Sequence, residues 1–368
     1  MPPRPSQVRD LRIEQVRPLI SPALLREELP LTDSAAELVA RSRRSVVDVL
    51  DGTDDRLLVV VGPCSVHDPA AALDYASRLA AVAEELRDDL LVVMRVYFEK
   101  PRTTVGWKGL LNDPNLDGSY NVNAGLRTAR RLLGDILGLG LPVGCEFLDP
   151  IIPQYTADLV AWGSIGARTA ASQVHRQLSS GLSMPIGIKN ATDGNVQIAV
   201  DAVRAAGSRH VFPGITDDGV AALLNTTGNP DCHVILRGSD SGPNYDSATV
   251  ASTVERLASA GLSERLLIDA SHGNSGKDHH RQPIVVRDVA SRVAAGERGI
   301  RGLMVESFLA AGRQDLILGR AGELRYGQSI TDACLDWAET ENLLRELAAA
   351  SVARRERAVA LVGSGSGG

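Results

Sequence analysis

The amino-acid sequence predicts an α/β fold, a (β/α)8 TIM barrel of parallel strands. Short apolar runs rich in β-branched residues alternate with longer segments whose apolar side chains recur with helical period. Eight such runs occur, and regular alternation of strand and helix over eight units is typical of a closed barrel. A doubly wound open sheet is the alternative, but it needs a switch-point crevice that the sequence does not reveal.

The expected strands, in chain order, occupy residues 57–61, 90–96, 141–147, 159–167, 184–188, 233–236, 265–268 and 302–305. The intervening stretches include amphipathic segments at residues 70–85, 125–137, 196–206 and 248–260, which we expect to be helices. One extra extended run, at residues 210–216, does not fit the repeat. We interpret it as part of an inserted β-hairpin near residues 208–232.

Three regions are expected from this pattern. Residues 1–50 precede the first strand and form an N-terminal extension with one helix, at residues 34–50. Residues 51–350 form the barrel with its insertion. Residues 351–368 end in a run of glycine and serine, and we expect this tail to be disordered.

Composition excludes several functional classes. The net charge of −6 over 368 residues argues against general nucleic-acid binding. No apolar run has the length of a membrane span, and the N-terminus has no apolar signal core. The four cysteines, at positions 64, 145, 232 and 334, are few and widely spaced, which favours reduced thiols and a cytoplasmic location.

Charged or metal-competent residues follow nearly every expected strand. In a parallel barrel the catalytic groups lie at the carboxyl ends of the strands, so this placement predicts an active site at the barrel mouth. The richest segment is 95–109, which combines four cations with threonine hydroxyls and glycines. Lysine occurs at only four positions in the chain, and two of them, Lys100 and Lys108, lie in this segment. Such a segment suits phosphate or carboxylate binding.

Two groups of residues can be separated by their chemistry. The first is cationic and comprises Arg95, Lys100, Arg102, Arg168, Lys189 and Arg237. If these side chains converge, they suit a polyanionic ligand such as a phosphorylated carboxylate or a sugar phosphate. The alternative is that some of them form structural ion pairs with Glu146, Asp149 or Asp269.

The second group offers soft, borderline and hard ligands, and it comprises Cys64, His272, Glu306 and Asp332. Mixed sulfur, nitrogen and oxygen ligation suits a divalent transition metal (Mn, Fe, Co or Zn) better than Mg or Ca. By spacing alone, Cys64 equally fits a small buried residue, and Asp332 equally fits the N-cap of a following helix.

Several motifs in this chain closely resemble the type I 3-deoxy-D-arabino-heptulosonate 7-phosphate (DAHP) synthases over residues 8–348. They are Gly-Pro-Cys-Ser-Val-His-Asp (62–68), Lys-Pro-Arg-Thr-Thr-Val-Gly-Trp-Lys-Gly (100–109), Ile-Gly-Ala-Arg (165–168), Ser-Gln-Val-His-Arg (172–176), Ile-Leu-Arg-Gly (235–238) and Ser-Ile-Thr-Asp-Ala-Cys (329–334). The resemblance implies a metal-dependent barrel enzyme that condenses phosphoenolpyruvate with erythrose 4-phosphate, the first step of the shikimate pathway.

The resemblance also implies a role for each matching residue. The metal ligands would be Cys64, His272, Glu306 and Asp332. Phosphoenolpyruvate would be bound by Arg95, Lys100, Glu146, Ala167, Arg168, Lys189, Arg237 and His272. Erythrose 4-phosphate would be bound by Pro101, Arg102, Thr103 and Asp332. Lys100, His272 and Cys64 would take part in catalysis.

Feedback inhibition by an aromatic amino acid is also implied, with tyrosine favoured over phenylalanine because Gly214 matches tyrosine-responsive relatives. The family's inhibitor pocket lies between the N-terminal extension and the inserted hairpin. Its residues here would be Asp10, Pro153, Gln154, Leu178, Leu182, Ser183, Phe212 and Gly214. The alternative for Gly214 is that it serves a turn with Pro213. The family forms homodimers or homotetramers through its extension.

Three departures from the family pattern lie near these residues. Ala171 stands where Glu is usual, Ala270 lies between Asp269 and Ser271, and Phe308 stands where His is common. Two other functions are alternatives: a 3-deoxy-octulosonate 8-phosphate synthase, and a catalytically inactive sensor of aromatic amino acids. The Lys-Pro-Arg-Thr-Thr loop disfavours the first, and the complete set of ligands and cations disfavours the second.

Overall fold

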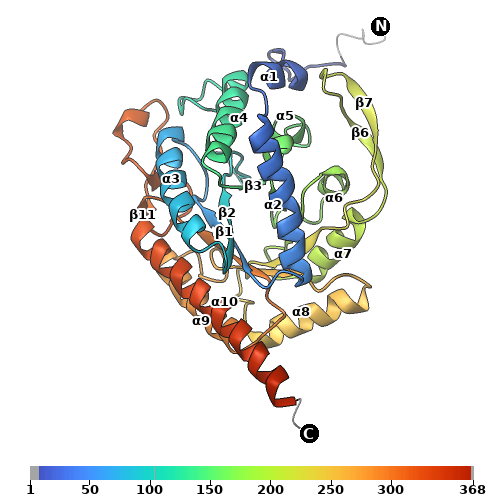
Figure 1. Ribbon diagram of the computed structural model, residues 1–368. Helices are drawn as coiled ribbons and strands as arrows, with labels where there is room; N and C mark the ends of the chain where they lie inside the picture. Colours follow the sequence, from blue (N-terminus) through green and yellow to red (C-terminus); the bar gives the residue numbers. More distant parts are fainter. Residues whose placement is uncertain (1–7, 103, 366–368) are drawn as a thin grey trace.

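The computed structural model describes residues 8–102 and 104–365, and its centre is a closed barrel of eight parallel strands (Figure 1). The order of the strands around the barrel is β1-β10-β9-β8-β5-β4-β3-β2. Their bounds are β1 (Leu57–Gly62), β2 (Leu90–Arg95), β3 (Val143–Glu146), β4 (Trp162–Ile165), β5 (Ile186–Lys189), β8 (His233–Leu236), β9 (Leu266–Asp269) and β10 (Gly302–Glu306). The predicted TIM-barrel class is therefore confirmed, and each strand overlaps one of the runs expected from the sequence.

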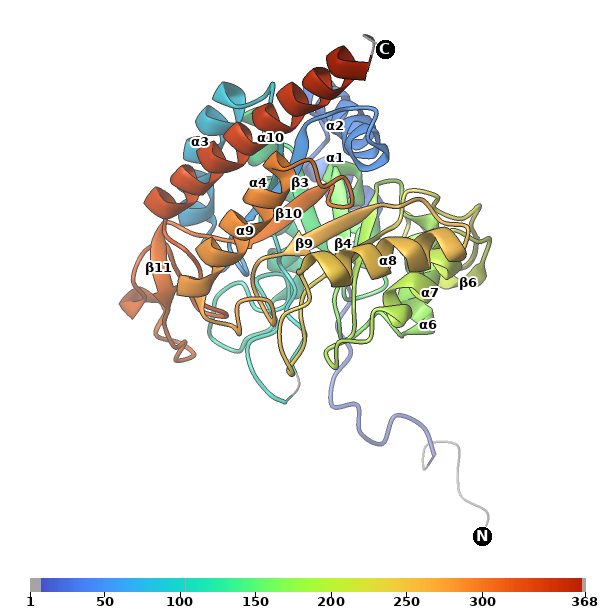
Figure 2. The ribbon, with the colours of Figure 1, turned by 90° about the horizontal axis from the view of Figure 1, so that it is seen from below.

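Helices surround the barrel, as the alternating pattern predicted (Figures 1 and 2). They are α3 (Pro69–Glu85), α4 (Val122–Gly138), α5 (Pro153–Thr156), α6 (Gln173–Gly181), α7 (Gln197–Ala206), α8 (Ser247–Ser259), α9 (Gln282–Ala294) and α10 (Trp337–Gly365). Single 3-10 turns occur at η2 (Ala157–Leu159), η3 (His279–Arg281) and η4 (Ala321–Glu323). Local chemistry fixes the start of α3, because Asp68 accepts hydrogen bonds from the Ala70 and Ala71 amides and Pro69 occupies the first helical position.

Helix α2 (Asp33–Asp51) closes the end of the barrel at which the strands begin. Its residues Val46, Val49 and Leu50 belong to the buried cluster inside the barrel, together with inward-facing side chains of the strands. In Figure 1 this helix crosses in front of the strands. Because that end is filled by apolar side chains, the open end lies at the carboxyl termini of the strands.

The N-terminal extension contains two helices, α1 (Pro22–Glu28) and α2, so the expectation of a single helix is wrong. Helix α1 spans only seven residues, which is too short for a hydrophobic period to be recognised in the sequence. Its start is nevertheless well defined, since the Ser21 side chain accepts a hydrogen bond from the Leu24 amide and Pro22 follows at once.

The inserted segment forms the expected hairpin, with β6 (Val211–Ile215) antiparallel to β7 (Ala221–Asn225). Its tip contacts α1, where the Ala23 amide donates to the Asp217 carbonyl at 2.7 Å and Arg26 pairs with Asp217 at 2.8 Å. The hairpin runs along the side of the barrel in Figure 1. Gly214 lies inside β6, so the turn interpretation of this glycine is wrong; the chain reverses between the two strands, where the Thr216 amide donates to the Val220 carbonyl.

A second small sheet, β11 (Ala310–Arg313) with β12 (Gln328–Ser329), precedes α10. Helix α10 continues to Gly365, so the expectation of a disordered tail from residue 351 is wrong for residues 351–365. Contacts distant in sequence stabilise this part of the helix: Arg354 donates to the Arg56 carbonyl, and Arg355 pairs with Asp89. Residues 366–368 lie outside the described part of the chain. Among the described helices, none combines the length and the apolar character needed to cross a membrane.

Candidate active site

The carboxyl ends of the barrel strands enclose a cavity of about 120 Å³ at the barrel mouth. Among the residues that line it are Arg95, Lys100, Pro101, Arg102, Glu146, Ala167, Arg168, Lys189, Arg237, His272 and Asp332. The structure thus brings together the candidate substrate residues that the sequence placed on separate strand ends. Thr103, also expected here, lies outside the described residues.

The loop after β2 folds back on itself and so directs Lys100 and Arg102 into the mouth. The Lys100 amide donates to the Lys108 carbonyl at 2.9 Å, and the Arg102 Nε donates to the Trp107 carbonyl at 2.7 Å. Gly109 is required for this fold: its φ is +113°, and a Cβ there would lie 1.9 Å from the Phe98 carbonyl oxygen. The glycine allows the two arms of the loop to approach closely.

The four candidate metal ligands gather beside this cavity. Ligand atoms of Cys64, Glu306 and Asp332 all lie within 4.8 Å of one another, and Cys64 Sγ is 3.7 Å from Asp332 Oδ2. His272 Nε2 is 3.7 Å from Glu306 Oε1. Asp332 does not cap a helix, because α10 starts at Trp337 and Asp336 accepts the hydrogen bond from the Glu339 amide. The helix-cap alternative for Asp332 is therefore wrong.

Lys100 and Cys64 are in direct contact, with Lys100 Nζ 3.0 Å from Cys64 Sγ. Burial, and next the charge of Glu306, raise the pKa of the Cys64 thiol to about 11. Burial alone would lower the pKa of Lys100, but the nearby Cys64, Glu306, Asp332 and Glu146 outweigh it and raise that pKa. Lys100 is therefore a permanent ammonium donor at neutral pH, and Cys64 loses its proton only when a cation binds.

Arg95 is buried under the mouth, and its guanidinium is used by the protein itself. Nη2 donates to Glu306 Oε1 at 2.8 Å and to the Cys64 carbonyl at 3.2 Å, and Nε donates to the Pro63 carbonyl at 3.2 Å. The guanidinium carbon lies 3.8 Å from the centre of the Tyr97 ring. Arg95 therefore fixes the positions of Cys64 and Glu306.

Asp269, which is fully buried, joins Lys189 to His272. Its Oδ2 lies 3.2 Å from Lys189 Nζ and 2.9 Å from His272 Nδ1, and its Oδ1 accepts a hydrogen bond from Ser271 Oγ at 2.6 Å. Burial alone would raise the pKa of Asp269, but His272 and Lys189 outweigh it and hold the pKa well below its usual range. Nδ1 of His272 also lies 2.7 Å from Ser271 Oγ, so with Nδ1 facing Ser271 and Asp269, the Nε2 atom of His272 is left to face Glu306.

One of the candidate substrate cations, Lys189, forms a structural ion pair with Asp269, as the alternative interpretation expected. Within the described residues, neither Arg168 nor Arg237 forms an ion pair. Position 171, where the family usually has glutamate, is an exposed alanine in this chain. Residue 171 therefore offers no carboxylate to pair with Arg168, in agreement with the unpaired state of Arg168 among the described residues. Ala270 and Phe308 are buried, so these two departures belong to the core.

The sequence did not indicate every residue of the mouth. Lys277 lines the cavity, has a φ of +63° and contributes to the lowered pKa of Asp332. Burial opposes that lowering, and Lys100 and His272 contribute more to it than Lys277 does. The rarity of lysine in this chain was a signal that could have identified Lys277. Thr192 and Thr331 also line the cavity, and nothing in their sequence context marks them.

Glu99 is a second residue that the sequence did not indicate. It is buried next to Lys100, and its carboxylate oxygens accept hydrogen bonds from the Leu148 amide at 3.2 Å and the Asp149 amide at 3.0 Å. Burial raises its pKa to about 8. Glu99 therefore ties the loop after β2 to the loop after β3.

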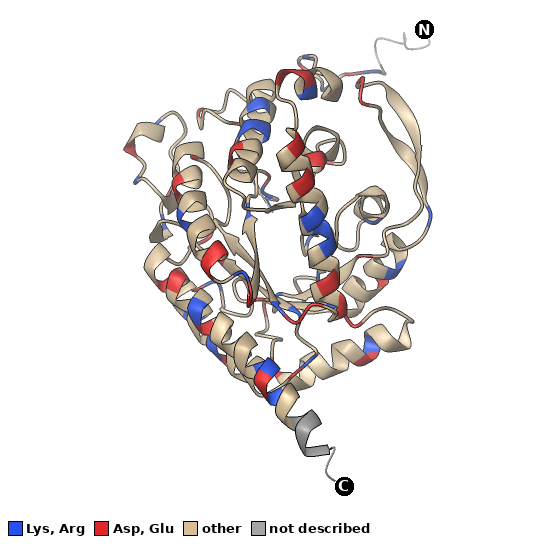
Figure 3. Cartoon of the chain, viewed as in Figure 1, with Lys and Arg blue, Asp and Glu red and all other residues tan. Residues whose placement is uncertain are grey.

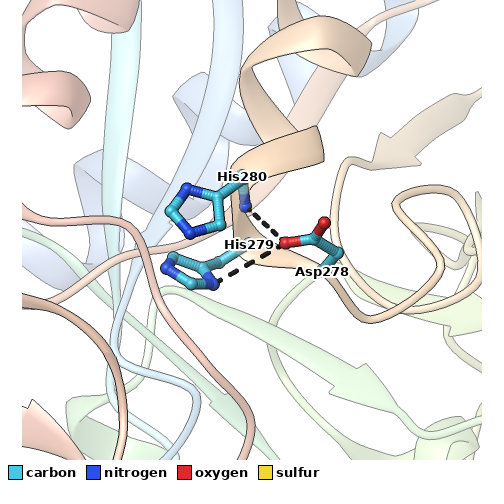
Figure 4. Close-up of side chains that lie close together, drawn as sticks. All are labelled: Asp278, His279 and His280. Atoms are coloured by element: carbon cyan, nitrogen blue, oxygen red, sulfur yellow. Dashed lines mark hydrogen bonds and ion pairs between the residues drawn. The ribbon is translucent and has the colours of Figure 1, made fainter.

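A second group that could hold a metal ion lies on η3, where Asp278, His279 and His280 are consecutive (Figure 4). The two imidazole rings are 3.9 Å apart, and His279 Nδ1 is 3.9 Å from Asp278 Oδ1. The Asp278 carboxylate already accepts a hydrogen bond from the His280 amide at 2.9 Å, as the N-cap of η3. These residues are therefore explained as a capped turn.

A separate cavity of about 550 Å³ lies between the hairpin, α1, α2, α5 and α6. Most of the expected effector residues line it: Pro153, Gln154, Leu178, Leu182, Ser183, Phe212 and Gly214. Asp10 does not line it and instead forms an exposed pair with Arg9 at 3.1 Å. Arg26 and Arg43, which the sequence did not indicate, add cations to its wall.

Comparisons with known proteins agree with this arrangement. Residues 28–345 match the model of the DAHP synthetase I family. The chain is 55% identical to the Phe-sensitive phospho-2-dehydro-3-deoxyheptonate aldolase of Escherichia coli (strain K12), over 94% of this chain and 98% of the relative. It is 52% identical to the Tyr-sensitive enzyme of the same strain, over 91% and 93%. A phospho-2-dehydro-3-deoxyheptonate aldolase structure from Francisella tularensis SCHU S4 superposes with a TM-score of 0.90 at 49% identity, covering 93% of this chain and 99% of that one.

We expect Glu99→Gln to stabilise the protein at alkaline pH relative to the wild type. The pKa of Glu99 in the folded protein, about 8, lies above its ordinary value of 4.5. The contribution of the neutral Glu99 carboxyl to the free energy of unfolding is therefore fully present below pH 4.5, and it is lost as the pH rises through about 8. Glutamine keeps an acceptor for one amide and cannot ionise. The melting temperature of the variant, relative to the wild type, should rise between about pH 5 and about pH 9 and then level off. The exposed substitution Glu356→Gln serves as the control, and a pH-independent difference for Glu99→Gln would contradict the prediction.

Proposed function

Because this chain belongs to the DAHP synthetase I family, we propose that its barrel mouth condenses phosphoenolpyruvate with erythrose 4-phosphate and water. The products are DAHP and inorganic phosphate, and the reaction is the first step of the shikimate pathway. The observation that carries this proposal is the meeting of cations from different strand ends in one cavity beside the Cys64, His272, Glu306 and Asp332 group. A site with this charge requires an anionic substrate.

We assign the phosphoenolpyruvate side of the mouth to Arg168, Lys189 and Arg237, supported by Lys100, Glu146, Ala167 and His272. Arg168 and Arg237 offer guanidinium donors that no carboxylate among the described residues occupies. Arg95 acts by positioning, since its donors are engaged within the protein. We assign erythrose 4-phosphate to Pro101, Arg102 and Asp332, which line the cavity, and to Thr103, which lies outside the described residues.

The residues fit a divalent transition metal (Mn, Fe, Co or Zn) by their donor set: the thiol of Cys64 and the carboxylates of Glu306 and Asp332 lie within 4.8 Å of one another, and the imidazole of His272 lies 3.7 Å from Glu306. The metal would be held by Cys64, His272, Glu306 and Asp332. When bound, it supplies Lewis-acid polarisation of the aldehyde of erythrose 4-phosphate. Arg95 and Asp269 support this group by fixing Glu306 and His272 respectively.

In the reaction, the enol carbon C3 of phosphoenolpyruvate forms a bond to the aldehyde carbon, and C2 gains cationic character. Water adds at C2, and the bond between C2 and the phosphate ester oxygen then breaks, releasing phosphate. The water loses both of its protons: one balances the proton that the aldehyde oxygen gains, and the other passes to the leaving phosphate as the new C2 hydroxyl becomes a carbonyl. Lys100, held as an ammonium, can donate a hydrogen bond to the aldehyde oxygen, whereas Glu146 is the candidate to accept the proton from water, since both ring nitrogens of His272 already have partners in this arrangement. The cations of the mouth hold both substrates in place for the attack.

We further propose that an aromatic amino acid, tyrosine in preference to phenylalanine, inhibits the enzyme from the cavity beside the hairpin. The apolar residues Leu178, Leu182 and Phe212 suit its ring, and Arg26 and Arg43 suit its carboxylate. The overall identities to the Phe-sensitive and Tyr-sensitive relatives are nearly equal, so the preference rests on Gly214.

A homodimer or homotetramer built through the N-terminal extension is also proposed. Val8, Leu11, Ile13 and Val16 are exposed on the segment that projects from the body in Figure 2. Exposed apolar side chains in series favour contact with another copy. Asp10 on the same segment would approach an effector cavity only in such an assembly. The four cysteines are all free thiols, which supports the expected cytoplasmic location.

The assay that tests the catalytic proposal measures phosphate release from phosphoenolpyruvate with four-carbon and five-carbon sugar phosphates, with and without a chelator. We expect release with erythrose 4-phosphate that the chelator abolishes. A preference for the five-carbon sugar phosphate would favour the octulosonate reaction, and no release with either would favour the inactive sensor.

We expect Cys64→Ser to lower turnover by at least about 100-fold, because a serine hydroxyl is a poor metal ligand at neutral pH and even indirect support of a ligand is worth about 10–100-fold. Metal content per chain should fall with activity, while the circular dichroism spectrum stays unchanged. Cys232→Ser removes a buried cysteine outside the site and is the matched control. Full activity of Cys64→Ser in chelator-treated buffer would exclude the assigned ligand.

Arg168→Ala should raise the KM for phosphoenolpyruvate by about 10–100-fold, the value of one or more charge-assisted hydrogen bonds, with a smaller effect on erythrose 4-phosphate. Lys189→Ala should act in the same direction and also lower kcat, because it removes one partner of Asp269. Arg102→Ala should instead affect erythrose 4-phosphate. Arg320→Ala, at an exposed pair with Glu323, is the control. Equal effects of Arg168→Ala and Arg102→Ala on both substrates would contradict the division of the mouth.

Gly214→Ser should shift inhibition from tyrosine toward phenylalanine. A Cβ at position 214 would lie 2.5 Å from Leu224 Cδ1, so the serine must displace the Leu224 side chain, which lines the effector cavity. A change of this size in an apolar pocket is worth about 1–3 kcal/mol of discrimination. Inhibition constants for both amino acids should be compared with those of Gly219→Ser at the hairpin turn. Tyrosine insensitivity of the wild type, or an unchanged preference in Gly214→Ser, would rule out this role of Gly214.

A further inference from the structure

A second cationic cavity, which we call the basic cavity, lies at the end of the barrel where the strands begin. Its volume is about 460 Å³, and it lies between the end of α2, the end of α9, the start of β10 and the last turns of α10. Its arginines are Arg56, Arg298, Arg301, Arg354, Arg355 and Arg357. The region is at the lower end of Figure 1, where α10 passes the end of α2, and Figure 3 shows Lys and Arg on this part of α10.

Three carboxylates also line the basic cavity, but two of them already have partners. Asp51 receives two hydrogen bonds from Arg265, at 2.6 and 2.8 Å, and Arg265 lies outside the cavity lining. Asp54 pairs with Arg56 at 2.6 Å. Arg355 is paired with Asp89, outside the lining. One lining carboxylate, Asp55, is then left against four lining arginines, Arg298, Arg301, Arg354 and Arg357, so the basic cavity carries an excess of positive charge.

The remaining arginines divide into two kinds. Arg354 and Arg355 attach α10 to the barrel, through the Arg56 carbonyl and through Asp89 respectively. In the described part of the chain, Arg298, Arg301 and Arg357 form no ion pair, and Arg301 Nε is buried without a hydrogen-bond partner. A buried donor without an acceptor costs free energy of folding, which a bound acceptor would remove.

Local geometry holds Arg301 in the basic cavity. Gly52 has a φ of +76°, and a Cβ there would lie 2.5 Å from Arg301 Nη1, so the absence of a side chain allows the guanidinium to lie against the backbone. Burial lowers the pKa of Arg301; Asp51, Glu264 and Asp55 oppose this, and the neighbouring Arg298 adds to it. Arginine stays charged under such conditions, so the like charges remain next to each other.

We propose that the basic cavity binds a small polyanion that carries at least two phosphate groups. Arginine binds phosphate oxygens through paired donors, and here the guanidiniums come from two sides, the start of β10 and the end of α10. The volume is that of a small-molecule site. Residues 354–357 lie beyond the family match, which ends at residue 345. The site is separate from the barrel mouth and from the effector cavity, and it does not rest on the proposed function.

Calorimetric titration of inorganic pyrophosphate into the full chain tests this proposal. The barrel mouth also attracts phosphate, so the comparison is made in the Arg168→Ala background, in which binding at the mouth is weakened. We expect pyrophosphate binding to persist there and to weaken at least tenfold when Arg298→Gln and Arg301→Gln are added. The control adds Arg313→Gln and Arg320→Gln, which remove the same charge from exposed positions, and it should bind like the background.

Further ligands define the class of anion, and a further variant tests the site if the double variant does not fold. Pyrophosphate should bind at least tenfold more tightly than inorganic phosphate or citrate. Arg357→Gln, an exposed change near the end of α10, should weaken binding severalfold with an unchanged melting temperature, which keeps the test valid if the double variant fails to fold. Three results would overturn the proposal. The first is an unchanged affinity for pyrophosphate in Arg357→Gln and in the folded double variant. The others are an equal loss of pyrophosphate affinity in the control, and an affinity for citrate equal to that for pyrophosphate.

Discussion

A buried ion pair between Arg95 and Glu306, with a 2.8 Å contact, holds the barrel mouth together. Removing both charges from water is costly, and the cost is offset only because each charge has several partners. Arg95 also donates to the carbonyls of Pro63 and Cys64, so one guanidinium connects β1, β2 and β10. The ligand group therefore depends on side chains whose positions are set by the closed barrel.

Two buried cations of the mouth, Arg95 and Lys189, are paired with buried carboxylates. Asp269 serves both Lys189 and His272, and Glu306 serves Arg95 while facing His272. Asp269 thus links Lys189 to His272, and Glu306 links Arg95 to His272. A substitution of Lys189 or Arg95 therefore also disturbs the paired carboxylate and His272. Arg168 forms no ion pair among the described residues, so its substitution tests substrate binding more directly.

The two ends of the barrel use charge differently. At the mouth, cations and carboxylates are connected in pairs, and the cavity is small. At the opposite end, α2 fills the barrel with apolar side chains, and arginines from β10 and α10 gather outside this plug around a larger cavity with fewer free carboxylates. Part of the wall of the basic cavity, Arg354, Arg355 and Arg357, lies on the part of α10 beyond the family match.

The sequence by itself determined the barrel strands, the helices α2, α3, α4, α7 and α8, and the strand ends that carry Cys64, Lys100, Arg168 and His272, because the alternation of apolar runs and the residues after them are local patterns. Only the tertiary structure decided the pairing of Lys189 with Asp269, the burial of Glu99 and the place of Gly214 inside β6. It also decided that the chain stays helical to Gly365. Burial and pairing depend on neighbours distant in sequence, such as Arg355 and Asp89, and no local period records them.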